Sequence, residues 1–108
     1  MAKILVDGGQ VVALVKPQFE AGHEQIGKNG IVRESSVHEK VIETVTAFAV
    51  DYGFSVKGLD FSPIQGGHGN IEFLAHLEKT NSPQNDAQTS IKEVVAQAHK
   101  EFKKNEEE

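Results

Sequence analysis

The sequence predicts an α/β fold in which a strand, a helix and two further strands follow one another, and a second helix closes the chain. Three observations support this order. Residues 11–15 form a continuously apolar run, which is typical of a buried strand. Apolar residues then recur at helical spacing between residues 37 and 52. Two strand-like segments, 54–61 and 70–77, are joined by a short glycine-rich loop, which indicates an antiparallel pair.

The start of the chain, residues 1–9 (MAKILVDGG), is interpreted as the last turns of a helix. Ile4 and Leu5 provide an apolar patch, and Gly8 and Gly9 suit a helix C-cap in the left-handed region. Because a helix end without its packing partners is a poor start for a domain, we expect a chain of 108 residues that opens in this way to be a fragment.

The first predicted strand covers residues 11–16. Both alternating sets of its positions are apolar, so we expect burial on both faces, as in parallel sheets covered by helices. Pro17 lacks an amide donor and ends the strand. The aperiodic residues 18–35 form a long connection at the strand's carboxyl end, where open α/β sheets place their ligands.

The central helix is expected to begin at Ser36, which forms an S-x-x-E capping box with Glu39. Gly53 ends it. In the strand that follows, the alternation changes phase across Gly58, which predicts a β-bulge. The last strand separates two faces: one carries Ile71, Phe73, Ala75 and Leu77, and the other carries Asn70, Glu72, Leu74 and His76.

The strand order follows from the connections. The first two strands flank a helix and are expected to be parallel, with a right-handed crossover. If the third strand inserts between them, it runs antiparallel to both, and the sheet is mixed with an antiparallel closing hairpin. That insertion places Glu72 near Lys16. Residues 80–90 are interpreted as a polar linker and residues 91–104 as an amphipathic helix.

Composition narrows the classes of function. The formal net charge is -5, and no basic cluster indicates a nucleic-acid surface on charge alone. There is no cysteine, no signal-peptide pattern and no apolar run of the ~20 residues that cross a bilayer. We therefore expect a cytoplasmic protein without a membrane partner. The five histidines lack the spacing of a metal site.

Three segments resemble the TlyA, or hemolysin A, family: LVKPQFEAG (14–22), GIVRE (30–34) followed by His38, and FSPIQGGHGNIEFL (61–74). These proteins are similar to FtsJ-like RNA ribose 2′-O-methyltransferases. The resemblance covers residues 1–79 and implies the C-terminal portion of a Rossmann-like class I methyltransferase domain. It also implies S-adenosylmethionine as cofactor and ribosomal RNA as partner, with the main cofactor-binding loop lying ahead of this chain.

The same resemblance implies catalytic residues. FtsJ-like enzymes use a Lys-Asp-Lys-Glu tetrad, in which Lys16 matches the second lysine and Glu72 the glutamate; the other two members are absent from this chain. A ribose 2′-hydroxyl is a poor nucleophile, so a lysine that accepts its proton and a glutamate that orients it suit the chemistry, and no metal is required. Methyl transfer is an in-line displacement that depends on positioning. The family's turn usually carries a proline where Gly67 stands.

Most of the candidate site residues can also be explained without a role in catalysis or binding. Lys16 is alternatively a strand-end charge in solvent, or half of a purely structural ion pair with Glu72. Lys28, Arg33 and Asn70 are candidate RNA-binding residues, and Lys28 and Arg33 are also candidates for contact with the cofactor. The two loop charges among them, Lys28 and Arg33, are alternatively solvated.

Gln18 and Glu20 either line the cofactor cleft or shape the loop. They flank the carboxyl end of the first strand, where the cleft is expected.

Two further functions compete with a partial catalytic domain that is inactive alone. One is a non-catalytic binding or oligomerising module, and an exposed edge of residues 11–16 would then favour self-association. The other is haemolysis, which we discount because the amphipathic C-terminal helix lacks a basic, aromatic-rich composition.

Overall fold

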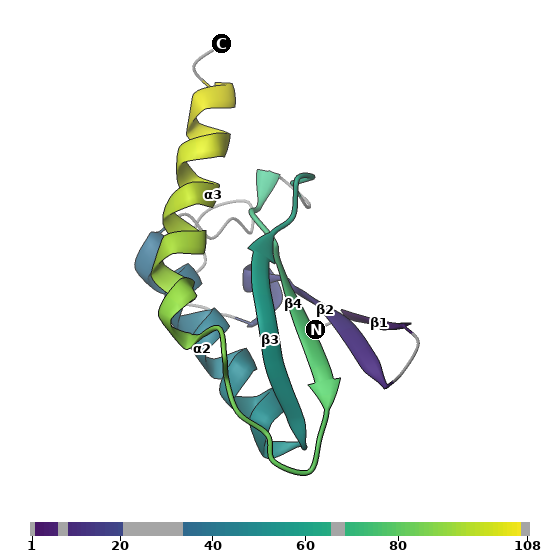
Figure 1. The fold of residues 1–108 in the computed structure, drawn as a ribbon. Helices are drawn as coiled ribbons and strands as arrows, with labels where there is room; N and C mark the ends of the chain where they lie inside the picture. The colour runs from purple at the N-terminus through teal and green to yellow at the C-terminus, as the bar shows by residue number, and fades with distance from the viewer. Residues whose placement is uncertain (1, 7–8, 21–33, 66–68, 107–108) are drawn as a thin grey trace.

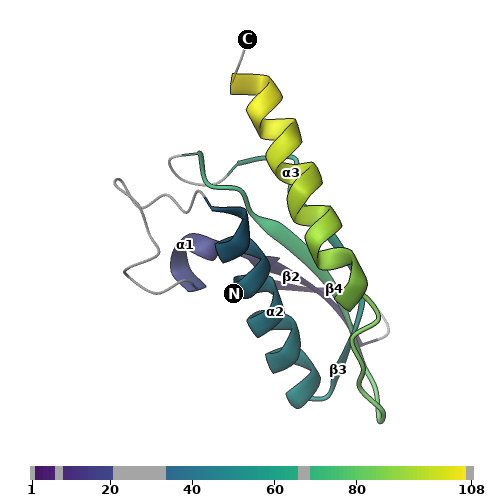
Figure 2. The ribbon, with the colours of Figure 1, turned by 90° about the vertical axis from the view of Figure 1, so that its left-hand side faces the viewer.

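The computed structural model describes residues 2–6, 9–20, 34–65 and 69–106. Its elements run in this order: β1 (Ala2–Val6), β2 (Gln10–Val15), α1 (Pro17–Glu20), α2 (Ser35–Asp51), β3 (Phe54–Phe61), β4 (Phe73–Lys79), the 3₁₀ turn η4 (Gln88–Ser90) and α3 (Ile91–Glu106). The strands form one sheet of order β1-β2-β4-β3. Helices α2 and α3 pack on the same face of that sheet, so the described chain has two layers (Figures 1 and 2).

The predicted insertion of the last strand is confirmed. β4 lies between β2 and β3 and runs antiparallel to both. β2 and β3 therefore point the same way without being neighbours. The expectation of a mixed sheet is wrong for the described strands, because every neighbouring pair, including β1 with β2, is antiparallel.

The expected helix end at the start of the chain is also wrong. Residues 2–6 form strand β1, which pairs with β2 from Ala2 opposite Leu14 to Val6 opposite Gln10. Gly9 follows with φ 75°, a left-handed conformation that suits a tight turn equally well. Five apolar-rich residues are too few for periodicity to separate a helix from a strand. Because β1 covers the edge of β2, the edge expected to drive self-association is occupied.

Strand β2 is buried on one face only. Val11, Ala13 and Val15 are at most 3% exposed, whereas Val12 and Leu14 are half-buried. The expectation of burial on both faces is therefore wrong for the described residues. The reason is architectural, since both long helices cover the same side of the sheet and no described helix covers the other (Figure 2).

Helix α2 begins one residue earlier than the sequence suggests. Glu34 is the N-cap, its side chain makes no capping hydrogen bond, and its carbonyl accepts from the amide of Val37 at 3.1 Å. The predicted capping box is thus wrong, because Ser36 already lies inside the helix. The predicted stop at Gly53 is confirmed: this residue has φ 90°, and its amide donates to the carbonyl of Val50.

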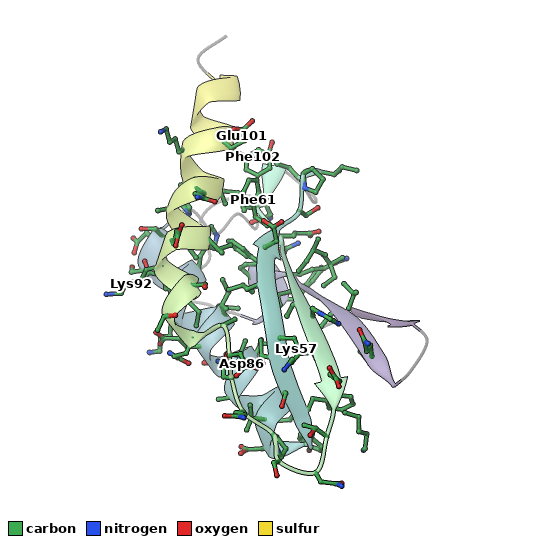
Figure 3. The ribbon with its side chains drawn as sticks, viewed as in Figure 1. Lys57, Phe61, Asp86, Lys92, Glu101 and Phe102 are labelled. Atoms are coloured by element: carbon green, nitrogen blue, oxygen red, sulfur yellow. The ribbon has the colours of Figure 1, made fainter. Side chains whose placement is uncertain are left out.

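The predicted bulge in β3 is confirmed as a register shift between Val56 and Gly58. Beside it, the backbone of Val56 exchanges hydrogen bonds with Gln84 and Asp86, which ties residues 84–86 to the edge of the sheet. Lys57 and Asp86 approach to 3.1 Å on the surface here (Figure 3).

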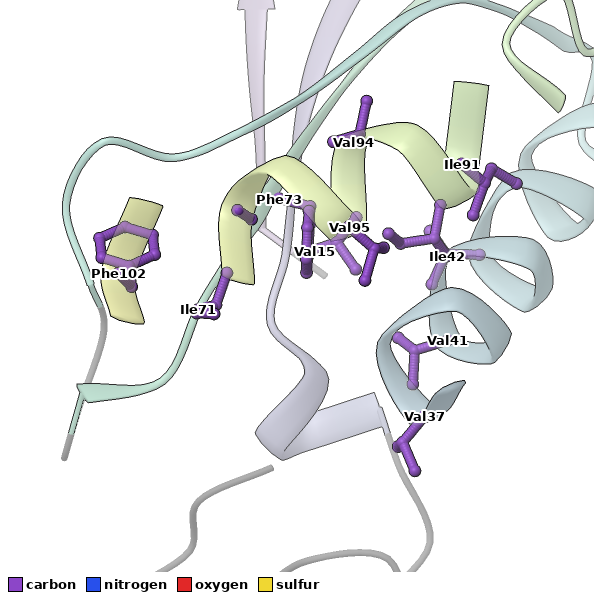
Figure 4. Close-up of a cluster of buried hydrophobic side chains, with 12 residues drawn as sticks. Val15, Val37, Val41, Ile42, Ile71, Phe73, Ile91, Val94, Val95 and Phe102 are labelled. Atoms are coloured by element: carbon purple, nitrogen blue, oxygen red, sulfur yellow. The ribbon is translucent and has the colours of Figure 1, made fainter. Parts of the chain in front are cut away.

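The main core lies between the sheet and the two helices (Figure 4). The sheet contributes Phe73 and Val15 to this core, and α2 and α3 contribute Ile42 and Val95. All four side chains are fully buried. Toward the far end of α3, Phe102 meets Phe61 of β3 edge-on, with ring centroids 6.0 Å apart (Figure 3). The C-terminal helix is therefore part of the folded unit, and its apolar stripe is core.

Candidate active site

The carboxyl end of β2 turns at once into a short helix. Pro17 stands at the first position of α1, where its missing amide proton costs nothing and its fixed φ suits a helix. The amide of Phe19 donates to the carbonyl of Lys16 at 2.9 Å, which closes the turn. Pro17 is buried and Lys16 is half-buried, so the turn is anchored while the lysine keeps access to solvent.

Glu72 lies across from this turn. The register of β2 and β4 ends with Val15 opposite Phe73, and Lys16 and Glu72 are the residues that follow this last pair outward. The carbonyl of Glu72 accepts from the amide of Ser62 at 2.8 Å, which fixes its backbone, and only 7% of the residue is exposed. The register brings the chain at Lys16 and at Glu72 to the same end of the sheet, and direct adjacency of the two residues stays a prediction.

The side chains do not form the ion pair considered above. Within the described ranges, Lys57 and Asp86 are the only charged groups in salt-bridge contact. The Lys16 ammonium instead lies 5.8 Å from the ring centroid of Phe19, a cation–π distance, and that ring is 74% exposed. Lys16 is therefore not neutralised by Glu72 in this arrangement.

Glu72 is bonded instead by Gln18. The Gln18 Nε2 group donates to Glu72 Oε2 at 2.8 Å. Gln18 Oε1 is buried and has no hydrogen-bond partner, and it is the one such buried side-chain atom among the described residues. The sequence placed Gln18 at the strand end but gave no signal that it contacts Glu72, because the two residues are 54 positions apart.

Of the candidate RNA-binding residues, Asn70 alone lies in the part of the chain that the structure describes. Asn70 is 2% exposed, so little of its surface is open to direct contact with RNA in this arrangement. Lys28, Arg33 and Gly67 lie outside the described residues, and so does the side chain of Glu20.

A second polar cluster lies between the helices. His38 Nδ1 and His99 Nε2 are 2.7 Å apart, and His38 is fully buried with its ring edge against Phe73. Burial lowers the pKa of His99 below that of a free histidine, and the nearby Glu39 carboxylate opposes this shift. This pair joins α2 to α3 and is not part of the Lys16–Glu72 edge.

Two other site classes find no support in the part of the chain that is described. There, no three potential ligands among His, Cys, Asp and Glu gather closely enough to hold a metal ion. None of the described helices has both the length and the apolar character to cross a membrane.

Comparison with known proteins identifies the family. The FtsJ-like methyltransferase profile matches residues 3–79. The putative rRNA methyltransferase YqxC of Bacillus subtilis is 48% identical over 103 residues, which cover 93% of this chain and 37% of that protein. The 16S/23S rRNA (cytidine-2′-O)-methyltransferase TlyA of Mycobacterium tuberculosis is 36% identical over 67 residues, which cover 62% of this chain and 25% of that protein.

A solved structure agrees. The putative hemolysin from Streptococcus thermophilus superimposes with a TM-score of 0.90 and 93% identity, covering 97% of this chain and 38% of that one. The chain thus spans little more than a third of the length of the Bacillus subtilis protein and of the Streptococcus thermophilus protein. The matched residues 3–79 include the KPQFE and GNIEFL segments. The chain therefore belongs to the FtsJ-like methyltransferase family.

Proposed function

We propose that this chain is the C-terminal part of an S-adenosylmethionine-dependent rRNA ribose 2′-O-methyltransferase of the TlyA type, and that it is inactive alone. The observation that carries the proposal is the placement of Lys16 and Glu72 at the same end of the sheet, the carboxyl end of β2. Ligands of open α/β sheets bind at this end of the strands. The relatives named as rRNA methyltransferases supply the substrate class.

The proposed roles follow from the two environments. Lys16 is half-buried and forms no ion pair with a carboxylate of the described residues, so its amino group can approach a ribose hydroxyl and stabilise the negative charge that develops on the oxygen. Glu72 is held rigidly by its backbone and by Gln18, so it can orient that hydroxyl or the lysine. Both residues stay as candidates for catalysis.

S-adenosylmethionine, when bound, supplies the electrophilic methyl group. The described residues contain no glycine-rich loop between a strand and a following helix that would hold its nucleoside. We place that loop in the part of the relatives that this chain does not match.

The uncovered face of the sheet supports the proposal that this chain is part of a larger domain. Val12, Leu14 and Leu74 are half-buried on the side that no described helix covers. A run such as VVALV suits a strand with helices on both sides. We propose that residues 1–79 are the end of a Rossmann-like methyltransferase domain, that residues 80–90 connect it to residues 91–104, and that the unmatched part of the relatives supplies the missing layer.

A non-catalytic module is the second candidate. The observation that favours it is β1, which closes the edge of β2 and gives the described sheet four strands without any further segment. Such a chain would fold and bind without catalysing methyl transfer.

A chimera separates the two candidates. The parts of the Streptococcus thermophilus protein that this chain does not match are joined to residues 1–108, and methyl transfer from radiolabelled S-adenosylmethionine to purified 16S and 23S rRNA is measured. We expect activity in the chimera and none in the 108-residue chain. Mapping of the product should place the methyl group on a ribose 2′-oxygen.

Two variants of the chimera test the site. Lys16→Ala and Glu72→Ala should each lower kcat by ~100-fold or more, the usual contribution of an acid–base or charge-stabilising group. Lys57→Ala removes an exposed lysine from the opposite edge of the sheet and should leave kcat unchanged. Full activity in both site variants would leave Lys16 and Glu72 with structural roles only, and an inactive chimera would favour the non-catalytic module.

A further inference from the structure

We infer that Gln18 is a positioning residue that fixes the carboxylate of Glu72 for methyl transfer. This inference rests on the proposed function above and extends it to a side chain outside the Lys-Asp-Lys-Glu set.

The contact is built by two separate elements. Pro17 anchors α1 in the core, and α1 carries the Gln18 amide back over the end of β4. There Nε2 donates to Glu72 Oε2 at 2.8 Å. Glu72 is only 7% exposed, so its carboxylate has lost most of its water and needs a donor from the protein. Within the described residues, Gln18 is the side chain that supplies one.

The unpartnered oxygen of Gln18 indicates what sets the orientation of the amide. If the amide were turned over, Oε1 would face the Glu72 carboxylate and two acceptors would repel each other. In the observed orientation Nε2 is satisfied, but Oε1 is buried without a partner. Buried acceptors without partners are rare in folded proteins and are found where another requirement dominates. Here the requirement is the bond to Glu72.

This bond holds one of the two Glu72 oxygens. Gln18 binds Oε2, and no described residue is found hydrogen-bonded to Oε1. Glu72 directly precedes Phe73, whose partner Val15 directly precedes Lys16. A carboxylate held at one oxygen presents the other in a fixed direction, toward an ammonium or a ribose hydroxyl.

The first test uses the active chimera with Gln18→Met. Methionine keeps the length of the side chain and removes both the donor and the unpartnered acceptor. We expect kcat to fall by ~10- to 100-fold, because loss of orientation acts on the reacting geometry. KM for S-adenosylmethionine and for rRNA should change by less than about twofold, because neither ligand has to contact Gln18 for this role.

Thermal unfolding separates positioning from structure. Gln18→Met removes the buried acceptor that has no partner, but it also leaves the Glu72 carboxylate without its donor, so the unfolding temperature should fall modestly. Gln97→Met is the matched control, since Gln97 lies exposed on α3, and it should change neither kcat nor stability. A Gln18→Met protein with wild-type kcat, or one whose kcat falls only in proportion to a loss of folded protein, overturns the inference.

A second measurement needs no methyl transfer. In the 108-residue chain, the Gln18 side-chain amide should give ¹H–¹⁵N resonances that exchange slowly with solvent, and Glu72→Ala should make them exchange rapidly. Rapid exchange in the wild type would remove the contact and the inference with it. Slow exchange together with an inactive chimera would instead refute the proposed function, so the two failures are distinguishable.

Discussion

At the residue scale, Lys16, Glu72 and Gln18 differ in how much of their placement could be predicted from the sequence. Lys16 and Glu72 could be chosen from the sequence because strand order brings them together. Gln18 could only be guessed as a cleft residue, since its bond to Glu72 depends on the path of a four-residue helix. Helix caps are equally local: the capping-box pattern at Ser36 is present in the sequence, but the chain enters α2 one residue earlier.

Glycine conformations provide a residue-scale prediction. Gly53 ends α2 with φ 90° and has open space where a Cβ would stand, so Gly53→Ala should destabilise through backbone strain alone, by ~1–2 kcal/mol. Gly58 has an ordinary φ and a neighbouring Cβ at 3.9 Å, so Gly58→Ala should be close to neutral. Urea unfolding of the two variants measures the difference, and equal losses would show that φ at Gly53 is not the cause.

At the element scale, α3 is joined to α2 by a histidine pair as well as by the core. In the contact between His38 Nδ1 and His99 Nε2, one nitrogen must donate and the other accept. Protonation of both rings removes the acceptor and places two positive charges side by side. The packing of α3 is therefore expected to depend on pH.

The sign of that dependence follows from His99. Its pKa in the folded chain is lowered by burial, with Glu39 opposing, so the unfolded chain takes up a proton more readily as pH falls below ~6.5. Stability should thus be highest above that pH and decline as pH falls toward the folded pKa. Thermal unfolding at pH 7.5 and pH 5.5 measures the decline, and His99→Gln should reduce it. Parallel pH profiles for the variant and the wild type would contradict this expectation.

Element prediction succeeded where a pattern was long and failed where it was short. α2, the hairpin of β3 and β4, its bulge and the apolar face of α3 each rest on several residues of consistent period. β1 rests on five residues, for which the helix and strand patterns cannot be separated. The pairing of β4 with both β2 and β3 could be predicted from the connections between the strands. No sequence pattern predicted the contact of residues 84–86 with Val56.

At the scale of the whole molecule, the sheet is covered on one side. The residues of β2 alternate between buried and half-buried, although all of residues 11–15 are apolar. Sequence patterning indicated two covered faces, and the described chain contains the helices for one. The sequence could not show this, because burial depends on elements that pack against a strand and not on the strand itself.

The uncovered face leads to a prediction about the isolated chain. Val12, Leu14 and Leu74 should make the 108-residue chain bind the apolar dye ANS, and the chimera should bind less per molecule if its additional residues cover this face. Equal dye binding by the two proteins would mean that the face stays open. Val12→Ser in the isolated chain should lower the signal, and Lys92→Ser, at an exposed position on α3, should not.

The insertion of β4 between β2 and β3 also determines the order in which the chain can fold. β1 and β2 form a hairpin from neighbouring residues, and so do β3 and β4, but the two hairpins meet only through pairs such as Val15 and Phe73. Contacts between residues this far apart in sequence form slowly, because the entropy cost of closing a long loop comes before the contacts can stabilise the chain. Lys16 follows one hairpin and Glu72 precedes β4 of the other, so the candidate site forms only once the two hairpins have paired. During synthesis, the β1–β2 hairpin leaves the ribosome before β4 and cannot pair with β4 until that strand has also emerged.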